Sequence, residues 1–587
     1  MAFVATPAPS GAGRFRARLA KADIGLAIIP VVGAVAALVL IAVPVAMLFY
    51  AAFHGPSDYL PFEAGAKWTT DNIVQVFNDR VLYTRILPDT MVFVLGTVLL
   101  TTSLAFTFAW LVERTDIKGS DVWFSLVLFP LLVPIPVLAI AWIFLMGPNA
   151  GWINLAIRGV FGFDGPGPIN IFSMAGLILC QSLASTPFVF LLMTSTLRSM
   201  NPQLEEASGA SGASPLTTFR RVTLPVLIPG LLAPVILVTL ITLEQFELPL
   251  IIGLPARINV FAYRIYNELN PASGLPNYGG AAAISLPFLL LGMIALMFYN
   301  WTIRRGDKFA VVTGKAYRQR HLTLGRWRFA AYGLLGFYAA LAVVLPAAVL
   351  IWTSLLGYSA PTFANMKNVS LAAYYDVIGN AIFWRALRNS LVVAFLTAVI
   401  TTTVGAILGW IIARSTFWGR GLLDFISFMS TGIPAVIVAL AVMILYLSFP
   451  VGLYGTIWIL IIAKSYRIAA TTRIARAGLL QIHPELEEAS AASGAKWLPM
   501  QWRIVIPLLL PALMSGFILI FIIGMREFTI PLILFSPENV VLPVLLWQLF
   551  QNGQPAPSAA LATFIMLMVL PMIFLARRFL IPRGRTE

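Results

Sequence analysis

The sequence has few of the residues that enzymes use for chemistry. Its only cysteine is Cys180, and its three histidines, His54, His321 and His483, lie far apart in the chain. A lone cysteine rules out an internal disulfide, and scattered histidines do not predict a zinc site. The loop that cradles nucleotide phosphates, Gly-x4-Gly-Lys-Ser/Thr, is absent from the sequence. We therefore expect no catalysis, no ATP hydrolysis and no resident metal or cofactor in this chain.

Charged residues are also scarce. They make up 11% of the chain, against 59% hydrophobic residues, and the mean hydropathy is +0.88. Many apolar runs reach the ~20 residues that a helix needs to cross a bilayer, and they number about twelve. The strict alternation expected of a membrane β-barrel is missing. The sequence therefore predicts an all-α polytopic membrane protein with about twelve transmembrane helices.

The net charge of +15 comes from basic residues that gather in three segments. These segments are a tail at residues 1–23, a central linker at residues 306–328, and the last residues of the chain. Excess Lys and Arg in loops marks the cytoplasmic side of a membrane protein. The pattern argues against a nucleic-acid partner. It predicts that both termini are cytoplasmic and that an even number of spans, six, precedes the linker.

A polar stretch between long apolar runs occurs twice, at residues 201–225 and again 282 residues later at 483–507. The first copy contains Glu205-Glu206-Ala207-Ser208, then Gly212, then Val222-Thr223-Leu224-Pro225. The second contains Glu487-Glu488-Ala489-Ser490, then Gly494, then Ile504-Val505-Ile506-Pro507. Because glycine ends helices readily, each copy predicts a short helix, a turn and a second helix on a membrane surface.

The rest of the chain repeats as well. Leu87, Thr101, Trp110, Arg114 and Pro134 recur 300 residues later as Leu387, Thr401, Trp410, Arg414 and Pro434. The sequence therefore predicts two six-helix halves in parallel orientation, at residues 24–305 and 329–587. Parallel repeats imply a pseudo-twofold axis along the membrane normal. Because the third span contains Pro130, Pro134 and Pro136, we expect a broken or kinked helix there.

Several charges lie within the predicted spans, where they are costly and often functional. They are Glu244, Glu247, Lys464, Arg467, Arg526 and Glu527. One interpretation is that they line a translocation path, and the other is that they form ion pairs holding the halves together. Lys464 and Arg467 can also extend toward cytoplasmic headgroups. Because Glu244 and Arg526 occupy equivalent positions of the repeat, we expect the two to pair across the axis.

The two polar stretches resemble the EAA loop of ABC importer permeases, E-A-A-x3-G-x9-I-x-L-P, with Ser in place of the second Ala. The fused layout resembles the ferric-iron permeases of this group, which have the type I importer fold. The resemblance implies an inner-membrane transport subunit that moves its substrate by alternating access. It implies two copies of a cytoplasmic ATPase, which bind ATP and Mg, and a periplasmic or lipid-anchored substrate-binding protein. The ATPase-coupling residues would be Glu205, Glu206, Ala207, Gly212, Glu487, Glu488, Ala489 and Gly494.

The substrate stays open at this point. Fused permeases for thiamine and 2-aminoethylphosphonate and unfused polyamine permeases are similar to this chain. Carboxylates such as Glu244 suit Fe³⁺ or an organic cation, whereas Arg526 suits an anion. A secondary transporter also has parallel repeats, although it has no use for paired EAA loops.

Overall fold

The computed structural model describes residues 24–162, 164–200, 203–271, 273–306, 322–357 and 365–580. The basic tail, most of the central linker and the extreme C-terminus lie outside these ranges, as do His321 and residues 201–202. The regular secondary structure of the described ranges is helical, apart from one antiparallel pair of short strands, β1 (His54–Gly55) and β2 (Lys67–Trp68), and an isolated parallel bridge between Thr115 and Leu322. The expected all-α polytopic architecture is confirmed.

The first half follows the predicted order of spans and loops. Its elements are α2 (Ile24–Ala37), η1 (Leu38–Ala42), α3 (Val43–Ala52), α4 (Asp71–Asn78), η2 (Leu82–Ile86), α5 (Leu87–Arg114), α6 (Ser120–Leu128), η3 (Phe129–Leu132), α7 (Ile135–Met146), α8 (Trp152–Phe161), α9 (Met174–Ser199), α10 (Gln203–Ala210), α11 (Pro215–Thr218), η4 (Phe219–Thr223), α12 (Leu224–Leu243), η5 (Pro249–Gly253), α13 (Phe261–Leu269) and α14 (Tyr278–Gly306).

The second half repeats this order. Its elements are α15 (Trp327–Ala339), η7 (Ala340–Val344), α16 (Leu345–Leu356), η8 (Asn365–Asn368), α17 (Ala372–Gly379), α18 (Ala381–Arg414), α19 (Arg420–Met429), α20 (Ala435–Ser448), α21 (Ile457–Lys464), α22 (Ala469–Gln481), α23 (Pro484–Ala492), α24 (Trp497–Met500), η9 (Gln501–Val505), α25 (Ile506–Arg526), α26 (Thr529–Ile533), α27 (Leu542–Gln551) and α28 (Pro555–Leu580).

Within the described part of the chain, seven helices are long and apolar enough to cross a membrane, and two bent helix pairs raise the number to nine. The other three positions of the twelve-span plan fall in the second half. They are taken by α19 with α20, by α21 with α22, and by α28. α19, α20, α21 and α22 are each shorter than a straight span, and the apolar stretch counted in α28 is Pro555–Met568.

The third span of each half is broken at the same repeated proline. In the first half, the helices Ser120–Leu132 and Ile135–Met146 meet at 103°. Pro134 (ψ 138°) and Pro434 (ψ 142°) both have extended backbones directly before α7 and α20. A proline lacks the amide hydrogen that would continue the helix, so the carbonyls before the break are left without a helical partner. The expected broken span is confirmed.

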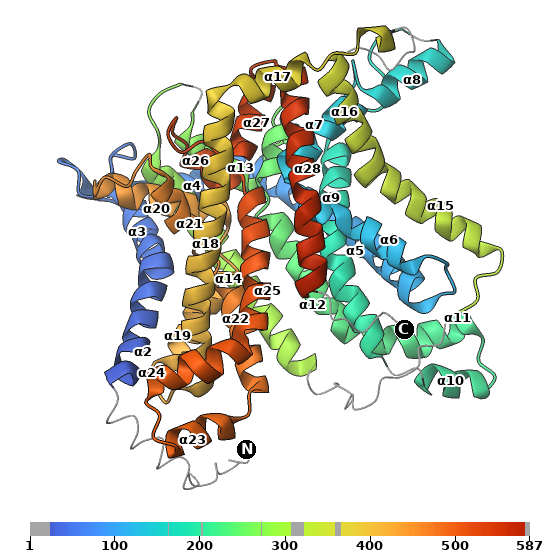
Figure 1. Cartoon of the computed structure of the whole chain (residues 1–587). Coiled ribbons are helices and arrows are strands. Elements are labelled where there is room, and N and C mark those ends of the chain that lie inside the picture. Colours follow the sequence, from blue (N-terminus) through green and yellow to red (C-terminus); the bar gives the residue numbers. More distant parts are fainter. Residues whose placement is uncertain are drawn as a thin grey trace.

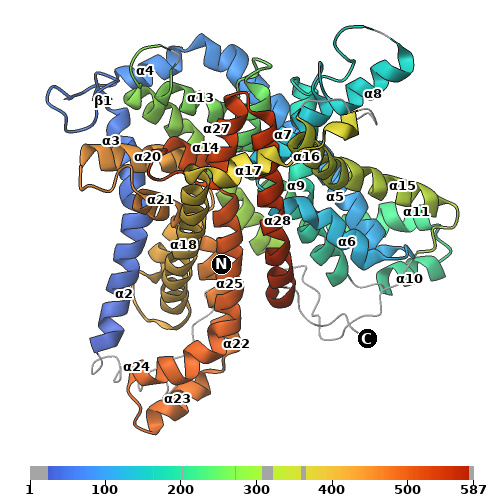
Figure 2. The ribbon, with the colours of Figure 1, turned by 45° about the horizontal axis from the view of Figure 1, so that its top comes forward.

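The first span of each half packs on the opposite half. α3 contacts α20, and α16 contacts α7. Figure 1 shows α2 and α3 beside α18 and α20, and α15 beside α5 and α6; Figure 2 shows the same from a second direction. This exchange interlocks the two halves. The helices α10, α11, α23 and α24 lie at one end of the molecule. The helices α4, α13, α17 and α27 lie at the other end.

Candidate functional site: paired surface helices and a central charged cluster

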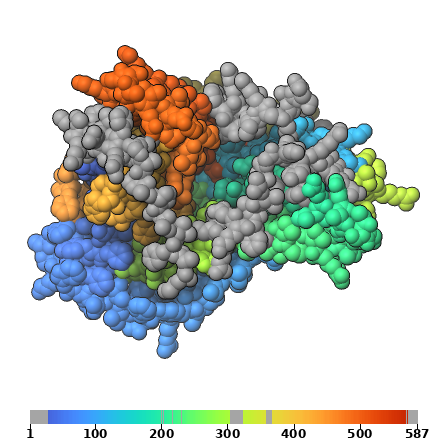
Figure 3. Space-filling model, turned by 90° about the horizontal axis from the view of Figure 1, so that it is seen from below, coloured from blue at the N-terminus to red at the C-terminus, as the bar shows by residue number. Residues whose placement is uncertain are grey.

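The two copies of the repeated polar stretch fold in the same way. Gly212 (φ +81°) lies in the turn after α10, and Gly494 (φ +80°) lies in the turn after α23. The backbone hydrogen bonds around the two turns also correspond: Gly212 N–H donates to Gly209 O at 3.0 Å, and Gly494 N–H donates to Ala491 O at 3.0 Å. Glycine is favoured at both turns because a positive φ strains other residues. Figure 3 shows both stretches on one face, well apart from each other.

The first glutamate of each copy forms an ion pair inside the chain. Glu205 lies 3.5 Å from Arg114, at the end of α5, and Glu487 lies 3.1 Å from Arg414, at the end of α18. The arginine side chains are 2% and 9% exposed. Glu205 also accepts a hydrogen bond from the Thr223 hydroxyl at 2.8 Å. Pairing at low exposure compensates the arginines for lost hydration and fixes each surface helix to a long span.

Each arginine also holds the end of a third helix. Arg114 donates to Leu197 O at 3.0 Å, and Arg414 donates to the equivalent Leu479 O at 2.9 Å. Arg414 makes one more such bond, to Ile482 O at 2.6 Å. These carbonyls lie at the ends of α9 and α22, where the helix provides no further donor. We call each set of contacts an arginine latch, because it joins the second span, the fourth span and the surface helix of its half.

The expected coupling residues differ in their contacts within the chain. Sequence reasoning grouped Glu205 and Glu487 with the residues that meet a partner, whereas both side chains are engaged within the chain. Glu206 is exposed, as are Ala207 and Ala489, and Glu488 is half-buried. Each copy therefore turns its first glutamate inward.

Sequence reasoning did not assign a function to Arg114 or Arg414. The signal was present, since the two recur at the repeat distance, four residues after Trp110 and Trp410. The tryptophans also contact the surface stretches: Trp110 lies edge-on to Phe219 at 5.1 Å, and Trp410 lies edge-on to Trp497 at 5.5 Å. Spacing alone could not show that the arginine at the end of one span meets the glutamate of another segment.

The predicted intramembrane charges gather near the middle of the molecule. Glu244 and Glu247 come from the end of α12 and the turn after it, and Arg526 and Glu527 come from the end of α25. Lys464 ends α21, and Arg467 follows it closely. The charged residues of α12 and α25 lie at or directly after the ends of these helices. The arrangement concentrates the charges where backbone groups are also free to bond.

The basic members of this cluster have specific partners. Arg467 lies 3.6 Å from Glu527. The Lys464 ammonium, 6% exposed, donates to Gly524 O at 2.7 Å. Arg526 donates to Leu131 O, one of the carbonyls released where the third span of the first half breaks. The cluster thus combines carboxylates, which can receive a cation, with cations that are already bonded to the protein.

Glu247 marks the pseudo-twofold axis. Its carboxylate accepts a hydrogen bond from the Thr529 hydroxyl at 3.4 Å, and these two residues are 282 apart in sequence. That is the repeat distance, so Glu247 meets its own structural equivalent. Two equivalent positions touch only at a symmetry axis. The expectation that repeat partners approach one another near the axis therefore holds for this pair.

The expected ion pair between Glu244 and Arg526 is not formed in this structure, although both residues lie within its described part. Each faces the broken third span of the opposite half instead. Arg526 bonds Leu131, and Glu244 lines a small cavity together with Thr431, the repeat equivalent of Leu131. Because released carbonyls offer the guanidinium ready acceptors, Arg526 does not need a carboxylate partner.

The cluster does not form a metal cage. Among the described residues, no group of three or more His, Cys, Asp or Glu side chains is placed to hold a metal ion. In this structure Glu247 accepts a hydrogen bond from Thr529, and Glu527 pairs with Arg467. Such an arrangement can offer successive weak contacts to a passing group.

Two segments of the chain, residues 102–307 and 405–583, match the family model described as "Binding-protein-dependent transport system inner membrane component". The two matches cover the two polar stretches and most spans of both halves. Each match contains one arginine latch.

Curated relatives match over most of this chain and most of their own length. A putative ferric transport system permease protein of Haemophilus influenzae is 26% identical, over 85% of this chain and 76% of the relative. A ferric transport system permease protein of Actinobacillus pleuropneumoniae is 24% identical, over 92% and 77%. A second Haemophilus influenzae protein, an Fe(3+)-transport system permease, is 23% identical over 89% and 95%.

Proposed function

This chain belongs to the binding-protein-dependent transport system inner membrane components, as a fused ABC importer permease with two copies of the domain, and we propose that its cargo is ferric iron. The observation that carries the proposal is the similarity along nearly the whole chain to permeases named for ferric transport. In this proposal the iron moves from the periplasm to the cytoplasm by alternating access. Both termini of the chain face the cytoplasm.

We infer two kinds of partner. Two copies of an ATPase subunit, which bind ATP and Mg, dock on α10 and α23. A periplasmic or lipid-anchored binding protein delivers the iron at the opposite end. The exposed Glu206 and its counterpart Glu488 suit an ATPase surface that carries Arg or Lys. The chain itself hydrolyses no ATP in this scheme.

The arginine latches support a mechanical route between the ATPases and the path. A displacement of α23 moves Glu487, which is paired with Arg414 at the end of α18. Because the Arg414 guanidinium also bonds Leu479 O, the end of α22 moves with it. α22 follows α21, which ends at Lys464 in the central cluster. In the first half, Arg114 connects α10 to α5 and α9 in the same way. Closure of two ATPases can thus become a relative rotation of the two halves.

The central cluster supports passage rather than storage of the cargo. Fe³⁺ prefers hard oxygen ligands, and the carboxylates of Glu244, Glu247 and Glu527 supply them. A path has to bind its ion weakly enough to release it, so separated carboxylates serve better than a closed cage. Lys464 and Arg467 keep the neighbouring charge balanced when no ion is present.

Reconstitution tests this proposal. The permease and its ATPase subunits are placed in proteoliposomes with the iron-loaded binding protein outside and ATP inside, and uptake of radioactive iron is followed. We expect uptake that requires both ATP and the binding protein. Uptake of thiamine, 2-aminoethylphosphonate or a polyamine instead, each tested with its own binding protein, would replace iron by that cargo. Uptake without ATP would point to a secondary transporter.

A further inference from the structure

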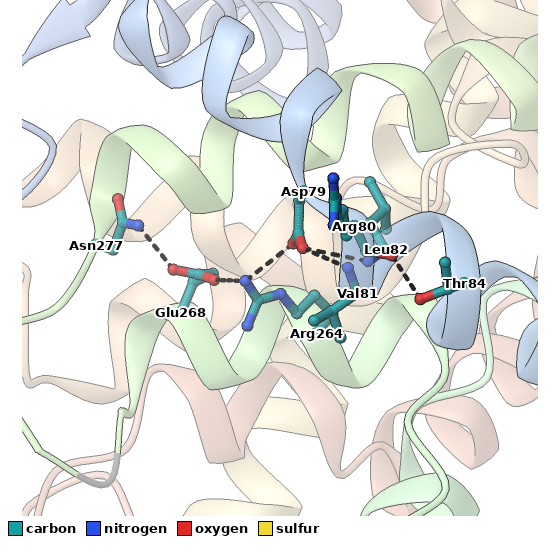
Figure 4. Close-up of polar contacts among 8 residues, drawn as sticks. All are labelled: Asp79, Arg80, Val81, Leu82, Thr84, Arg264, Glu268 and Asn277. Atoms are coloured by element: carbon teal, nitrogen blue, oxygen red, sulfur yellow. Dashed lines mark hydrogen bonds and ion pairs between the residues drawn. The ribbon is translucent and has the colours of Figure 1, made fainter.

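A polar network fills the space between α4, α13 and α14 at the outer end of the first half, opposite α10 and α23. The Arg264 guanidinium lies 2.7 Å from Glu268 and 3.4 Å from Asp79. The Asn277 amide donates to the other oxygen of Glu268 at 2.7 Å. Figure 4 shows Arg264 between the two carboxylates, with Asn277 at one end of the chain of contacts.

The second half contains the same backbone framework. Asp79 accepts from Val81 N at 2.9 Å, and Asn380 accepts from Ile382 N at 2.8 Å, so Asn380 is the counterpart of Asp79. The Thr90 hydroxyl accepts from the amide that opens α13, and the Ser390 hydroxyl accepts from the amide that opens α27. Counting from these amides, Leu545 replaces Arg264 and Leu549 replaces Glu268.

The fourth member of the network has a counterpart as well. The carbonyl of Asn277 accepts from Ala281 N at 3.0 Å, and the carbonyl of Gln554 accepts from Ser558 N at 3.1 Å, at the start of α14 and α28 respectively. The ionic network of the first half is thus replaced by two leucines and two amides in the second.

The second half has a cavity at this place. Its volume is about 300 Å³, at the lower end of the range for ligand sites. It is lined by Asp376, Val377, Asn380, Phe383, Leu545, Leu549, Gln554 and Pro557. All four counterparts of the network, Asn380, Leu545, Leu549 and Gln554, therefore line an open space. The one charged group in this lining is the carboxylate of Asp376.

We propose that this cavity receives a basic side chain, Arg or Lys, from the substrate-binding protein. Its apolar wall, formed by Phe383, Leu545 and Leu549, suits the aliphatic stem of such a side chain. Its rim offers the Asp376 carboxylate to the charged head. The incoming side chain provides the second half with the positive charge that Arg264 provides in the first half. The inference rests on the proposed function, because it assumes a binding protein that docks on this end.

The pairing gives the docking a defined orientation. Among the described residues, the network occupies this place in the first half and the cavity occupies it in the second, so a binding protein with two unlike lobes fits in one way. Directional pairing of this kind provides specificity more than affinity.

The test measures affinity between the iron-loaded binding protein and the permease–ATPase complex in nanodiscs. Asp376→Lys opposes the incoming cation. A triple variant, Asn380→Asp with Leu545→Arg and Leu549→Glu, rebuilds the first-half network and fills the cavity from within. The control is Asp164→Lys, an exposed carboxylate in the outer loop after α8. Co-purification of the ATPase subunits checks that each variant is assembled.

We expect both cavity variants to lower the affinity about tenfold or more, and the control to stay within about twofold of the wild type. A Lys or Arg→Glu change at one position of the binding protein should restore binding to Asp376→Lys. Unchanged affinity in both cavity variants overturns the proposal. The same result is expected if lipid or solvent occupies the cavity. If the wild-type complex does not bind the iron-loaded binding protein, the proposed function fails as well. If the wild-type complex binds it and neither cavity variant changes the affinity, only the cavity proposal is refuted.

Discussion

Replacing Arg414 by glutamine should release α23 from the membrane helices. The Arg414 guanidinium is 9% exposed, forms an ion pair with Glu487 at 3.1 Å, and bonds two carbonyls at 2.9 and 2.6 Å. Removing one partner of a well-buried ion pair costs about 3–5 kcal/mol. Glu487 is 14% exposed and glutamine can keep one carbonyl bond, so we expect about 2 kcal/mol. That free energy corresponds to a roughly 30-fold change in the equilibrium for local opening.

Hydrogen exchange measures this opening directly. In the purified complex, the backbone amides of α23 should exchange about 30-fold faster in Arg414→Gln than in the wild type. Transport per ATP hydrolysed should fall in the same variant, because the ATPase then moves a helix that is no longer latched. Arg414→Lys should recover only part of the protection, since an ammonium cannot reproduce the fork of bonds.

Two comparisons separate the latch from a general loss of charge. Arg420→Gln removes an exposed arginine near the end of the same span, whose only described bond is to Ser415 O, and should change neither exchange nor coupling. Adding Glu487→Gln to Arg414→Gln should cost little more than Arg414→Gln alone, because the pair is already broken. Unaltered exchange of α23 in Arg414→Gln would refute the latch as a mechanical link.

Three further outcomes are expected. Gly212→Val should weaken ATPase co-purification by straining a positive φ at a cost of about 1–2 kcal/mol, whereas Gly209→Ala, in the preceding helix, should not. The pKa of Asp116 is lowered by a hydrogen bond from Leu324 N and by the guanidinium of Arg328. Protection of residues 322–328 from proteases should therefore persist at neutral pH and decline as the pH falls through about 4 and below. Lys464→Met should leave Gly524 O unpaired and reduce iron uptake without detaching the ATPase, as measured by transport and co-purification.

Much of the fold follows from patterns that the bilayer enforces. Long apolar runs, proline at corresponding points and basic residues between spans reflect the cost of exposing polar backbone or charge to lipid. These constraints act along the sequence, so the span order, the break at Pro134 and the turn at Gly212 could all be predicted. The exchange of first spans between the halves could not, because α3 is apolar on every side and its sequence does not select α7 or α20 as a neighbour.

The charged residues show where sequence repeats stop being informative. Equivalence under the repeat predicts that Glu244 and Arg526 are symmetry mates. Their opposite charges predict an ion pair between them. Symmetry mates touch only on the axis, however, and the contact between Glu247 and Thr529 places the axis three residues further along the chain. At Glu244 and Arg526 the mates are already separated, so each meets the same element of the other half: Arg526 meets Leu131, and Glu244 meets a cavity beside Thr431. The repeat therefore fixes what kind of surface each charge faces, whereas the partner of Arg526 is a carbonyl that the break at Pro134 releases.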